Sequence, residues 1–385
     1  MRYVCWHPLL TDHQSHTYAA LSTLANGELV VNVERVGDSL REAQGWVRQS
    51  VDIVPEQLIP SQNWHQWAKV ELAKYPTAIH VFGSPFESFR QMRIMYAACR
   101  LGLKVAVISE PFSTTGLAYL EDTDSLKNSI KSWLRPIIYK AYGAIFARKI
   151  HAVFAISPLA CDQYRSIGIP AENIYPFGYF VPANDIADNR NTELRPHLRL
   201  VFVGSLIARK GLRIAIQAVQ SLLDEGYRIS LDVFGAGDPE QYDLSPAIKY
   251  VGVVPFGQAA ETISKYDALL LPSLFDGWGV VVNEALQGGT PVCCSTAVGA
   301  GAVVEAYDAG EVFSNGDVSD LTRILRAWCN NRDRLKIYQA NARRAALQLT
   351  PTVAANYFDS AIIAANGRHE RPAVPWYKWP AGANK

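Results

Sequence analysis

One short stretch, residues 267–294, limits the folds open to this chain more than any other. It begins with an apolar run typical of a buried strand and continues through a loop that contains Gly277 and Gly279. A helix opens near Val280, and a second apolar run follows at residues 292–294. Strand, helix and strand in close succession are typical of a parallel βαβ unit. Ligands of such sheets bind beyond the carboxyl ends of the strands, which is where the two glycines fall.

Short β-branched runs alternate with helical stretches along the whole chain, as in parallel α/β sheets. Strands are predicted at residues 3–6, 29–34, 78–82, 105–108, 152–156, 173–176, 200–203, 229–234, 248–251, 268–271, 291–294 and 310–313. We therefore predict an α/β protein with two doubly wound, Rossmann-like domains that face each other across a cleft.

A polar segment separates the two predicted domains. Residues 181–197 are rich in Asn, Asp and Pro and lack apolar periodicity, which is typical of a linker. The predicted parts are an N-terminal domain at 1–185, a linker at 186–198, a C-terminal domain at 199–350, a helix at 352–365 and a tail at 366–385. The tail is rich in proline and aromatic residues, and we expect it to pack along a surface.

The composition excludes several classes of protein. Of 385 residues, 49% are hydrophobic and 19% are charged, as in globular proteins with well-formed cores. A net charge of +1 does not favour nucleic acid as a partner. The six cysteines are scattered without a metal-ligand pattern, so we expect reduced thiols and no metal. Since neither a signal peptide nor a membrane-spanning run is evident, we expect a cytoplasmic protein.

Two carboxylates flank the start of the predicted helix. Asp276 precedes it and Glu284 lies just over one turn inside it, so the two acids can hold two parts of one elongated polar ligand. Carboxylates accept hydrogen bonds from vicinal hydroxyls, which makes a sugar or a ribose the natural ligand. The glycines allow close approach of the backbone, and the free N–H groups of the helix start favour a phosphate or a sugar oxygen.

This segment resembles the acid-x7-acid motif of family 4 of the retaining GT-B glycosyltransferases (glycosyltransferases group 1), which transfer a sugar from a nucleotide-sugar donor. Three further segments resemble the opening strand with its basic pair, the glycine-rich turn and the base-binding segment of the family's C-terminal domain: residues 202–211, 231–238 and 250–255. All occur in the family's order and spacing over about residues 198–350. The preceding residues match only loosely.

The resemblance implies a role for each acid. Glu284 would bind the ribose hydroxyls of the nucleotide, and Asp276 would contact the donor sugar, where most members have the longer Glu. Four residues would contact the donor through their backbone N–H groups: Gly277, Trp278, Gly279 and Val280. Without the resemblance, Glu284 is interpreted as a solvated helix carboxylate and Asp276 as a turn residue that caps the following backbone.

The basic pair Arg209 and Lys210 follows a strand and a tight glycine turn. In the family such cations neutralise the donor diphosphate while its bond to the sugar breaks, which lowers the barrier electrostatically. A surface pair at a helix start is the alternative, although a helix N-terminus disfavours cations unless an anion is bound. Many members have Arg directly after the glycine, where this chain has serine. Further donor contacts are expected at Gly204, Ser205, Gly235 and Val253. Tight turns alone would also explain the glycines.

The N-terminal domain would hold the acceptor. Its predicted loop over residues 6–16 contains three histidines, and Gln14 and Ser15 stand where the family commonly has a glycine pair. The histidine spacing matches no standard zinc site, so His13, Gln14 and His16 are candidate substrate contacts instead. Glu110 follows a predicted strand, where some relatives have a His that contacts the donor sugar. A carboxylate that caps the next turn is the alternative for Glu110.

A basic and aromatic stretch indicates a possible membrane contact. Residues 127–149 contain six basic residues and no acidic one, interleaved with aromatic and aliphatic side chains. Such stretches bind anionic membrane interfaces. A domain helix with one buried face fits the pattern equally well, and Pro136 is expected to kink or start that helix. The membrane candidates are Lys127, Lys131, Trp133, Arg135 and Lys140.

Together these features predict a retaining glycosyltransferase that moves a sugar from a nucleoside-diphosphate sugar to a glycan or a lipid-linked acceptor, without a metal or another cofactor. Asp276, Lys210 and Arg209 are the residues predicted to act in catalysis. The implied setting is bacterial surface-polysaccharide or lipopolysaccharide synthesis, with peripheral contact to the inner face of the plasma membrane. Two alternatives stay open: a GT-B sugar-nucleotide epimerase, which needs no acceptor, and a non-catalytic nucleotide-sugar-binding protein.

Overall fold

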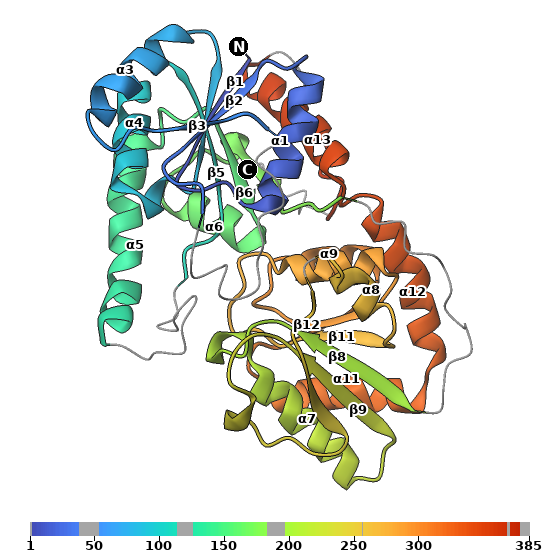
Figure 1. The fold of residues 1–385 in the computed structure, drawn as a ribbon. Helices are drawn as coiled ribbons and strands as arrows, with labels where there is room; N and C mark the ends of the chain where they lie inside the picture. Colours follow the sequence, from blue (N-terminus) through green and yellow to red (C-terminus); the bar gives the residue numbers. More distant parts are fainter. Residues whose placement is uncertain are drawn as a thin grey trace.

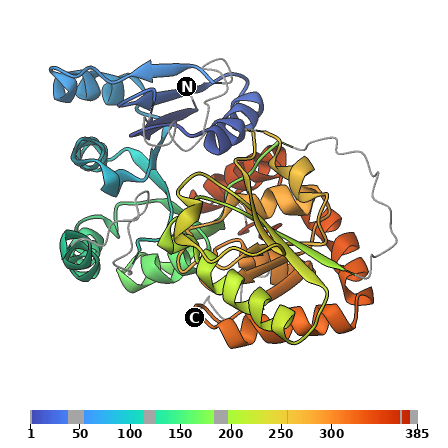
Figure 2. The same ribbon diagram turned by 60° about the horizontal axis from the view of Figure 1, so that its bottom comes forward.

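The computed structural model describes residues 2–37, 54–113, 126–182, 197–255, 257–367 and 370–377. These residues form two parallel sheets flanked by helices, which appear as two bodies in Figure 1 and are seen from a second direction in Figure 2. Blue to green segments and the red last helix make up the first body, and yellow-green to orange segments make up the second. Within the described ranges no helix has the length and apolar character needed to cross a membrane.

The first sheet has seven strands in the order β3-β2-β1-β4-β5-β6-β7, and all neighbours are parallel. Its strands are β1 (Tyr3–His7), β2 (Leu29–Val33), β3 (Glu56–Leu58), β4 (Ile79–Gly83), β5 (Lys104–Ser109), β6 (Ala152–Ile156) and β7 (Ile174–Phe177). The accompanying helices are α1 (Asp12–Leu24), α3 (Trp64–Lys74), η1 (Pro85–Glu87), α4 (Phe89–Arg100), α5 (Leu126–Phe146), α6 (Pro158–Ser166) and η2 (Ala171–Asn173). Strands β1, β4 and β6 are buried along their whole length, as expected for a parallel sheet covered on both faces.

The second sheet has six parallel strands in the order β10-β9-β8-β11-β12-β13. Its strands are β8 (Leu198–Val203), β9 (Ile229–Phe234), β10 (Ile248–Gly252), β11 (Ala268–Leu271), β12 (Val292–Ser295) and β13 (Gly310–Phe313). The helices are η3 (Ala208–Lys210), α7 (Leu212–Asp224), η4 (Pro239–Gln241), α8 (Ala259–Ile263), α9 (Val280–Gln287), α10 (Gly301–Tyr307), α11 (Val318–Asn330) and α12 (Asp333–Ala346). The strand order reverses between β8 and β11, so the loops after these two strands lie side by side at the point where open sheets bind ligands.

The last helix, α13 (Pro351–Ala365), packs on the first sheet and lies beside α1, in red in Figure 1. The side chains of Arg2 and Tyr3 donate hydrogen bonds to the carboxylate of Asp359. Phe358 stacks on Phe154 of β6, with ring centroids 3.9 Å apart. The chain therefore returns to its N-terminal half after completing the second sheet.

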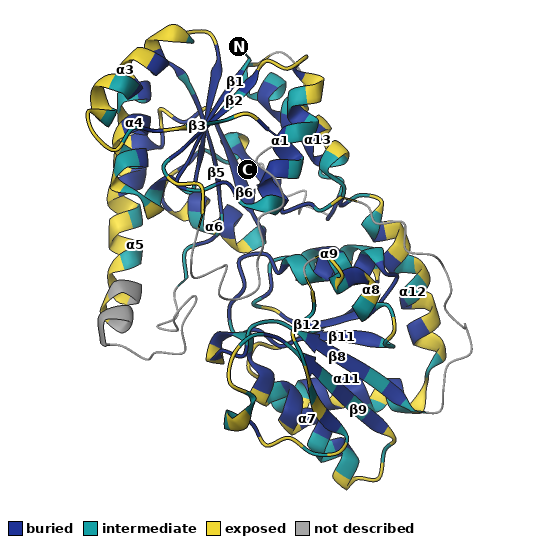
Figure 3. Ribbon diagram, viewed as in Figure 1, coloured by how far each residue is buried: buried dark blue, intermediate teal, exposed yellow. Residues whose placement is uncertain are grey.

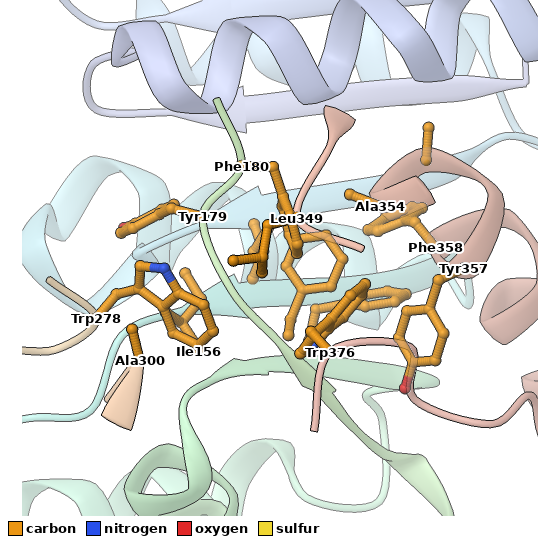
Figure 4. Packing of buried hydrophobic residues seen from close by; sticks show 14 of the residues in the cluster. Ile156, Tyr179, Phe180, Trp278, Ala300, Leu349, Ala354, Tyr357, Phe358 and Trp376 are labelled. Atoms are coloured by element: carbon orange, nitrogen blue, oxygen red, sulfur yellow. The ribbon is translucent and has the colours of Figure 1, made fainter. Parts of the chain in front are cut away.

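A cluster of aromatic side chains lies between the two sheets (Figure 4). Trp278, from the loop before α9, packs so closely on Gly178 that a Cβ there would lie 2.5 Å from the indole ring. Trp376 packs between Phe180 and Tyr357, with ring centroids 4.7 and 4.9 Å away. The expectation that the tail packs along a surface is wrong for this part, because Trp376 fills the aromatic cluster and is fully buried.

Most predicted strands occur within two residues of their predicted places, and the predicted fold class is confirmed. Strand β3 was not predicted, because its three residues, Glu-Gln-Leu, carry no apolar signal. The predicted loop over residues 6–16 is wrong beyond Thr11, since α1 begins at Asp12. Of the predicted linker, residues 186–196 lie outside the described residues, and Leu198 already belongs to β8.

Candidate functional site

The loop after β11 and the start of α9 form the centre of the candidate site. Two backbone hydrogen bonds hold this loop: the N–H of Asp276 donates to the carbonyl of Ala297 (2.9 Å), and the N–H of Gly299 donates to the carbonyl of Asp276 (3.1 Å). Gly279 has a left-handed φ of 88°, and the helix begins at the next residue. The first N–H groups of a helix have no partner within it, so they can donate to a ligand oxygen.

Lys210 and Asp276 meet where the loops after β8 and β11 lie side by side. The ammonium Nζ of Lys210 donates to Oδ2 of Asp276 over 2.5 Å. Both side chains are largely buried, with 16% and 10% of their surface exposed. Burial alone would raise the pKa of Asp276, but the charges of Lys210 and Arg209 outweigh it and hold this pKa below its usual value. The carboxylate is therefore ionised and paired at neutral pH.

Arg209 connects the loops that follow β8 and β11. Its Nη1 donates to the carbonyl of Phe275 over 2.7 Å, and its own carbonyl accepts from the N–H of Leu274 at 2.8 Å. The guanidinium is buried, so it supplies a fixed positive charge close to Asp276 as well as a structural bond. Its predicted contact with the donor diphosphate stays a prediction.

Glu284 occupies the partly exposed side of α9, next to the fully buried Asn283. Burial raises the pKa of the Glu284 carboxyl to about 7. Within the described residues, no hydrogen-bond donor or cation offsets this burial. A carboxylate whose pKa lies near neutral pH is a common feature of functional sites. Its predicted bond to ribose would supply the hydrogen-bond donors that the described residues do not.

The remaining donor-site candidates of the C-terminal half follow β8, β9 and β10. A Cβ on Gly235 would lie 1.8 Å from the carbonyl oxygen of Gly204, so close packing alone explains Gly235. A Cβ on Gly204 would make ordinary contacts at 3.5 Å or more. Ser205 is partly exposed and Val253 is exposed, so both side chains are accessible. All four stay predicted contacts.

The ends of β5 and β6 reach across to the loop after β11. A Cβ on Gly277 would lie 2.4 Å from Oε2 of Glu110, and a Cβ on Gly299 would lie 2.6 Å from the Cβ of Ser157. The predicted candidate Glu110 thus lies beside the predicted donor loop. Ser157 was not predicted, although its φ of 92° and ψ of 158° are rare for a non-glycine residue and typical of functional sites. The sequence marks Ser157 only by its place after a strand.

The three N-terminal candidates lie on α1 rather than in a loop. Oε1 of Gln14 accepts from the N–H (3.2 Å) and the hydroxyl (2.9 Å) of Thr11, which forms the cap of α1. Nε2 of His13 lies 3.1 Å from the Thr11 hydroxyl, and its ring lies 4.2 Å from that of Tyr179. Burial lowers the pKa of His16. The loop prediction fails because the Thr11–Gln14 cap starts the helix early; contact of these side chains with substrate stays a prediction.

The indole of Trp278 has a structural role. Its Nε1 donates to Oδ1 of Asn283 over 2.9 Å, and Nδ2 of Asn283 donates to the carbonyl of Tyr179 over 2.7 Å. This chain of bonds holds α9 against the segment after β7. Asn283 was not predicted, although a polar residue beside Glu284 within an apolar helix was an available signal. The predicted donor contact through the Trp278 backbone is not affected.

Helix α5 lies at the edge of the first body, with a largely exposed outer side (Figure 3). Its exposed large apolar residues are Ile130, Trp133, Leu134, Ile137, Ile138 and Ile145. Lys140 is exposed among them, whereas Arg135 is partly buried and donates to the carbonyl of Ser113 (2.9 Å); the membrane contact of both stays a prediction. The side chains of Lys127 and Lys131 lie outside the described residues. Pro136 lies inside α5, not at its start.

Residues 186–345 match the family model of the glycosyl transferases group 1. The chain is similar to the amylovoran biosynthesis glycosyltransferase AmsK of Erwinia amylovora, with 28% identity over 200 residues, which is 48% of this chain and 49% of that protein. It is also similar to the putative colanic acid biosynthesis glycosyltransferase WcaL of Escherichia coli, with 25% identity over 195 residues, 47% of this chain and 48% of that protein. The chain thus spans about half the length of the curated relatives that it matches.

Two solved structures have the same fold. Anabaena HepE in complex with UDP and glucose matches with a TM-score of 0.64 and 14% identity, over 95% of this chain and 100% of that one. WaaG, a glycosyltransferase involved in lipopolysaccharide biosynthesis, matches with a TM-score of 0.57 and 14% identity, over 95% of this chain and 100% of that one. At this identity the likeness concerns the fold alone, which is of the GT-B type.

Proposed function

Because residues 186–345 match the family model of the glycosyl transferases group 1, we propose that the chain belongs to this family and transfers a sugar from a nucleoside-diphosphate sugar to a glycan or a lipid-linked acceptor, with retention of the anomeric configuration. The observation that carries the proposal is the arrangement where the strand order of the second sheet reverses, between β8 and β11. Lys210, Asp276 and the start of α9 meet there, and Glu284 follows one turn later.

Each of these groups suits one part of the donor. Glu284 would accept hydrogen bonds from the ribose hydroxyls, which would stabilise its ionised form. Lys210, Arg209 and the N–H groups that open α9 would bind the diphosphate and stabilise the charge that grows on it as the sugar departs. Since these groups can take up that charge, the reaction needs no resident metal. The departing phosphate would take the acceptor proton, so we assign no side chain as a base.

The expected donor and product follow from the proteins that the chain resembles. AmsK and WcaL are named for amylovoran and colanic acid biosynthesis, and HepE has been solved with UDP-glucose. We therefore expect a UDP-sugar as donor and a bacterial surface polysaccharide or lipopolysaccharide as the product. The reaction would take place in the cytoplasm, with Glu110 and the start of α1 on the acceptor side of the site.

A binding measurement tests this function. We expect one of UDP, GDP and ADP to bind the wild type in calorimetry, and Glu284→Ala to weaken that binding at least about tenfold through the lost ribose bonds. Incubation of the matching nucleotide sugar without an acceptor distinguishes the alternatives, because an epimerase would convert the sugar and a binding protein would leave it unchanged. If no nucleotide binds, or if Glu284→Ala binds as well as the wild type, the proposed donor site is wrong.

The outer side of α5 supports a contact with an anionic membrane. Trp133 is 71% exposed and Ile137 is 55% exposed, and both project from the side of the helix opposite the buried Tyr142 and Phe146. The sequence has no acidic residue between positions 125 and 161. Exposed apolar side chains on a segment whose charged residues are all basic match a bilayer with anionic headgroups. An acceptor carried by a lipid would then meet the site at that surface.

Vesicle sedimentation tests the membrane contact. The wild type should bind vesicles of phosphatidylcholine and phosphatidylglycerol, and bind those of phosphatidylcholine alone more weakly. The double variant Trp133→Ser, Ile137→Ser should reduce binding at least about tenfold, since two apolar side chains that become buried in the bilayer contribute several kcal/mol to binding. Val70→Ser on α3, 64% exposed in the wild type, is the matched control. Equal binding by the wild type and the double variant would exclude this surface as the contact.

A further inference from the structure

The ion pair between Lys210 and Asp276 conflicts with a simple division of roles. The family resemblance implies that Lys210 binds the diphosphate and that Asp276 contacts the donor sugar. In the structure they bind each other, with 2.5 Å between Nζ and Oδ2. We propose, on the basis of the proposed function, that Asp276 is the counter-ion of Lys210 until the donor binds, and that the donor diphosphate then takes its place on the ammonium.

The geometry indicates which partner moves. The backbone of Asp276 is held on both sides, by the carbonyl of Ala297 at 2.9 Å and the N–H of Gly299 at 3.1 Å. The hydroxyl of Ser273 lies 3.5 Å from the same Oδ2 that Lys210 contacts. An aspartate side chain has only two torsions, whereas a lysine side chain has four. The exchange therefore occurs by a swing of the ammonium, while the carboxylate stays in place.

The charges explain why the chain would use such an exchange. A lysine ammonium that is largely buried is costly to leave unpaired, so Asp276 stabilises the site before the donor arrives. The same carboxylate repels the diphosphate once it is bound, because both carry negative charge close to one cation. Asp276 thus weakens the binding of the nucleoside diphosphate and promotes its release after transfer. The fixed cation Arg209 remains beside both groups throughout.

This role differs measurably from contact with the donor sugar. An acid that only accepts hydrogen bonds from sugar hydroxyls affects the binding of the nucleotide sugar and leaves the binding of the free nucleoside diphosphate unchanged. A counter-ion of Lys210 affects both ligands, because both carry the diphosphate. Removing the charge should therefore tighten the binding of the product.

The experiment compares UDP binding by the wild type, Asp276→Asn and Asp276→Glu in calorimetry and stopped flow; GDP or ADP replaces UDP if it binds the wild type better. Asparagine keeps the shape and the acceptor oxygen but removes the charge. We expect Asp276→Asn to bind UDP about tenfold tighter, about 1.4 kcal/mol, mainly through slower dissociation. Asp276→Glu keeps the charge and should stay close to the wild type. Asp243→Asn, at an exposed position of the same domain, is the control and should change nothing.

The outcomes separate the two proposals. Unchanged or weaker UDP binding by Asp276→Asn would overturn the counter-ion role, and a loss confined to the UDP-sugar would assign Asp276 to the sugar instead. Equal tightening by Asp276→Glu would also overturn it, since the charge would not be the cause. A damaged site does not gain affinity, so tighter binding cannot result from misfolding. If the wild type binds no nucleoside diphosphate, the proposed function falls as well.

Discussion

Glu284→Gln should stabilise the protein at neutral and alkaline pH while it impairs nucleotide binding. Burial raises the pKa of this carboxyl from 4.5 to about 7. The folded state therefore holds a proton that the unfolded state has already lost between these two values, and stability falls as the pH rises through this window. Above pH 7 the folded protein carries a partly buried charge that no donor or cation among the described residues compensates. Glutamine has the same shape and no charge to bury.

The magnitude follows from the two pKa values. At 1.36 kcal/mol per pKa unit, a rise from 4.5 to about 7 corresponds to about 3 kcal/mol of stability lost above pH 7. The advantage of Glu284→Gln should be less than about 1 kcal/mol at pH 5, because this pH lies only just above the unfolded pKa of 4.5, and about 3 kcal/mol at pH 8. A domain of this size would show the difference at pH 8 as a rise in Tm of several degrees.

Urea unfolding of the wild type and Glu284→Gln at pH 5, 6, 7 and 8 measures this effect. Glu261→Gln is the control, because Glu261 is exposed on the same domain and its substitution should give no gain that grows with pH. The binding of UDP-glucose to both proteins is measured at the same pH values. A nucleotide sugar is used because its diphosphate does not titrate between pH 5 and pH 8. A constant stability difference from pH 5 to pH 8, or a loss of stability at pH 8, would refute the reasoning that Glu284 is a destabilised, ligand-binding carboxylate.

Three further predictions concern other parts of the molecule. Trp376→Ala should lower stability by about 3–5 kcal/mol in urea unfolding because it empties a fully buried aromatic site, whereas Trp133→Ala, 71% exposed, should change it by less than about 0.5 kcal/mol. Lys210→Met should lower kcat/KM for transfer by about 100-fold or more, because it removes a positive charge at the departing diphosphate; activity within threefold of the wild type would exclude that role. Gly178→Ala should cost about 1–3 kcal/mol, measured by thermal unfolding, because its Cβ would lie 2.5 Å from the Trp278 ring; an unchanged Tm would show that the contact is loose.

Much of the fold was predictable because its signal is local. The apolar runs that became β6, β9 and β11 carry the strand pattern within a few residues, and α7 and α11 have clear helical periodicity. The motif of Asp276 and Glu284 was likewise visible, since loop, helix start and both acids are contiguous in the chain. Predictions failed where a tertiary contact outweighs local composition, as for β3, which pairs with β2 despite its polar residues.

The partners of each site residue were not predictable, because they come from distant parts of the chain. Nothing in the sequence near Asp276 indicates that Lys210, 66 positions earlier, would pair with it; parallel strand order places them together. The burial that raises the pKa of Glu284 depends on the packing of α9, which its own residues do not specify. The contact of Glu110 with Gly277 requires both sheets to face each other.

The sequence by itself therefore determined the elements, the class of fold and the residue types available for chemistry, since hydrophobic periodicity, glycine positions and motif spacing act over short distances. Tertiary structure alone decided which charges neutralise each other, which carboxylate is left partly buried with no partner among the described residues, and which aromatic side chains hold the two halves together. Electrostatic energy and desolvation depend on separations in space, and those separations exist only once the chain has folded.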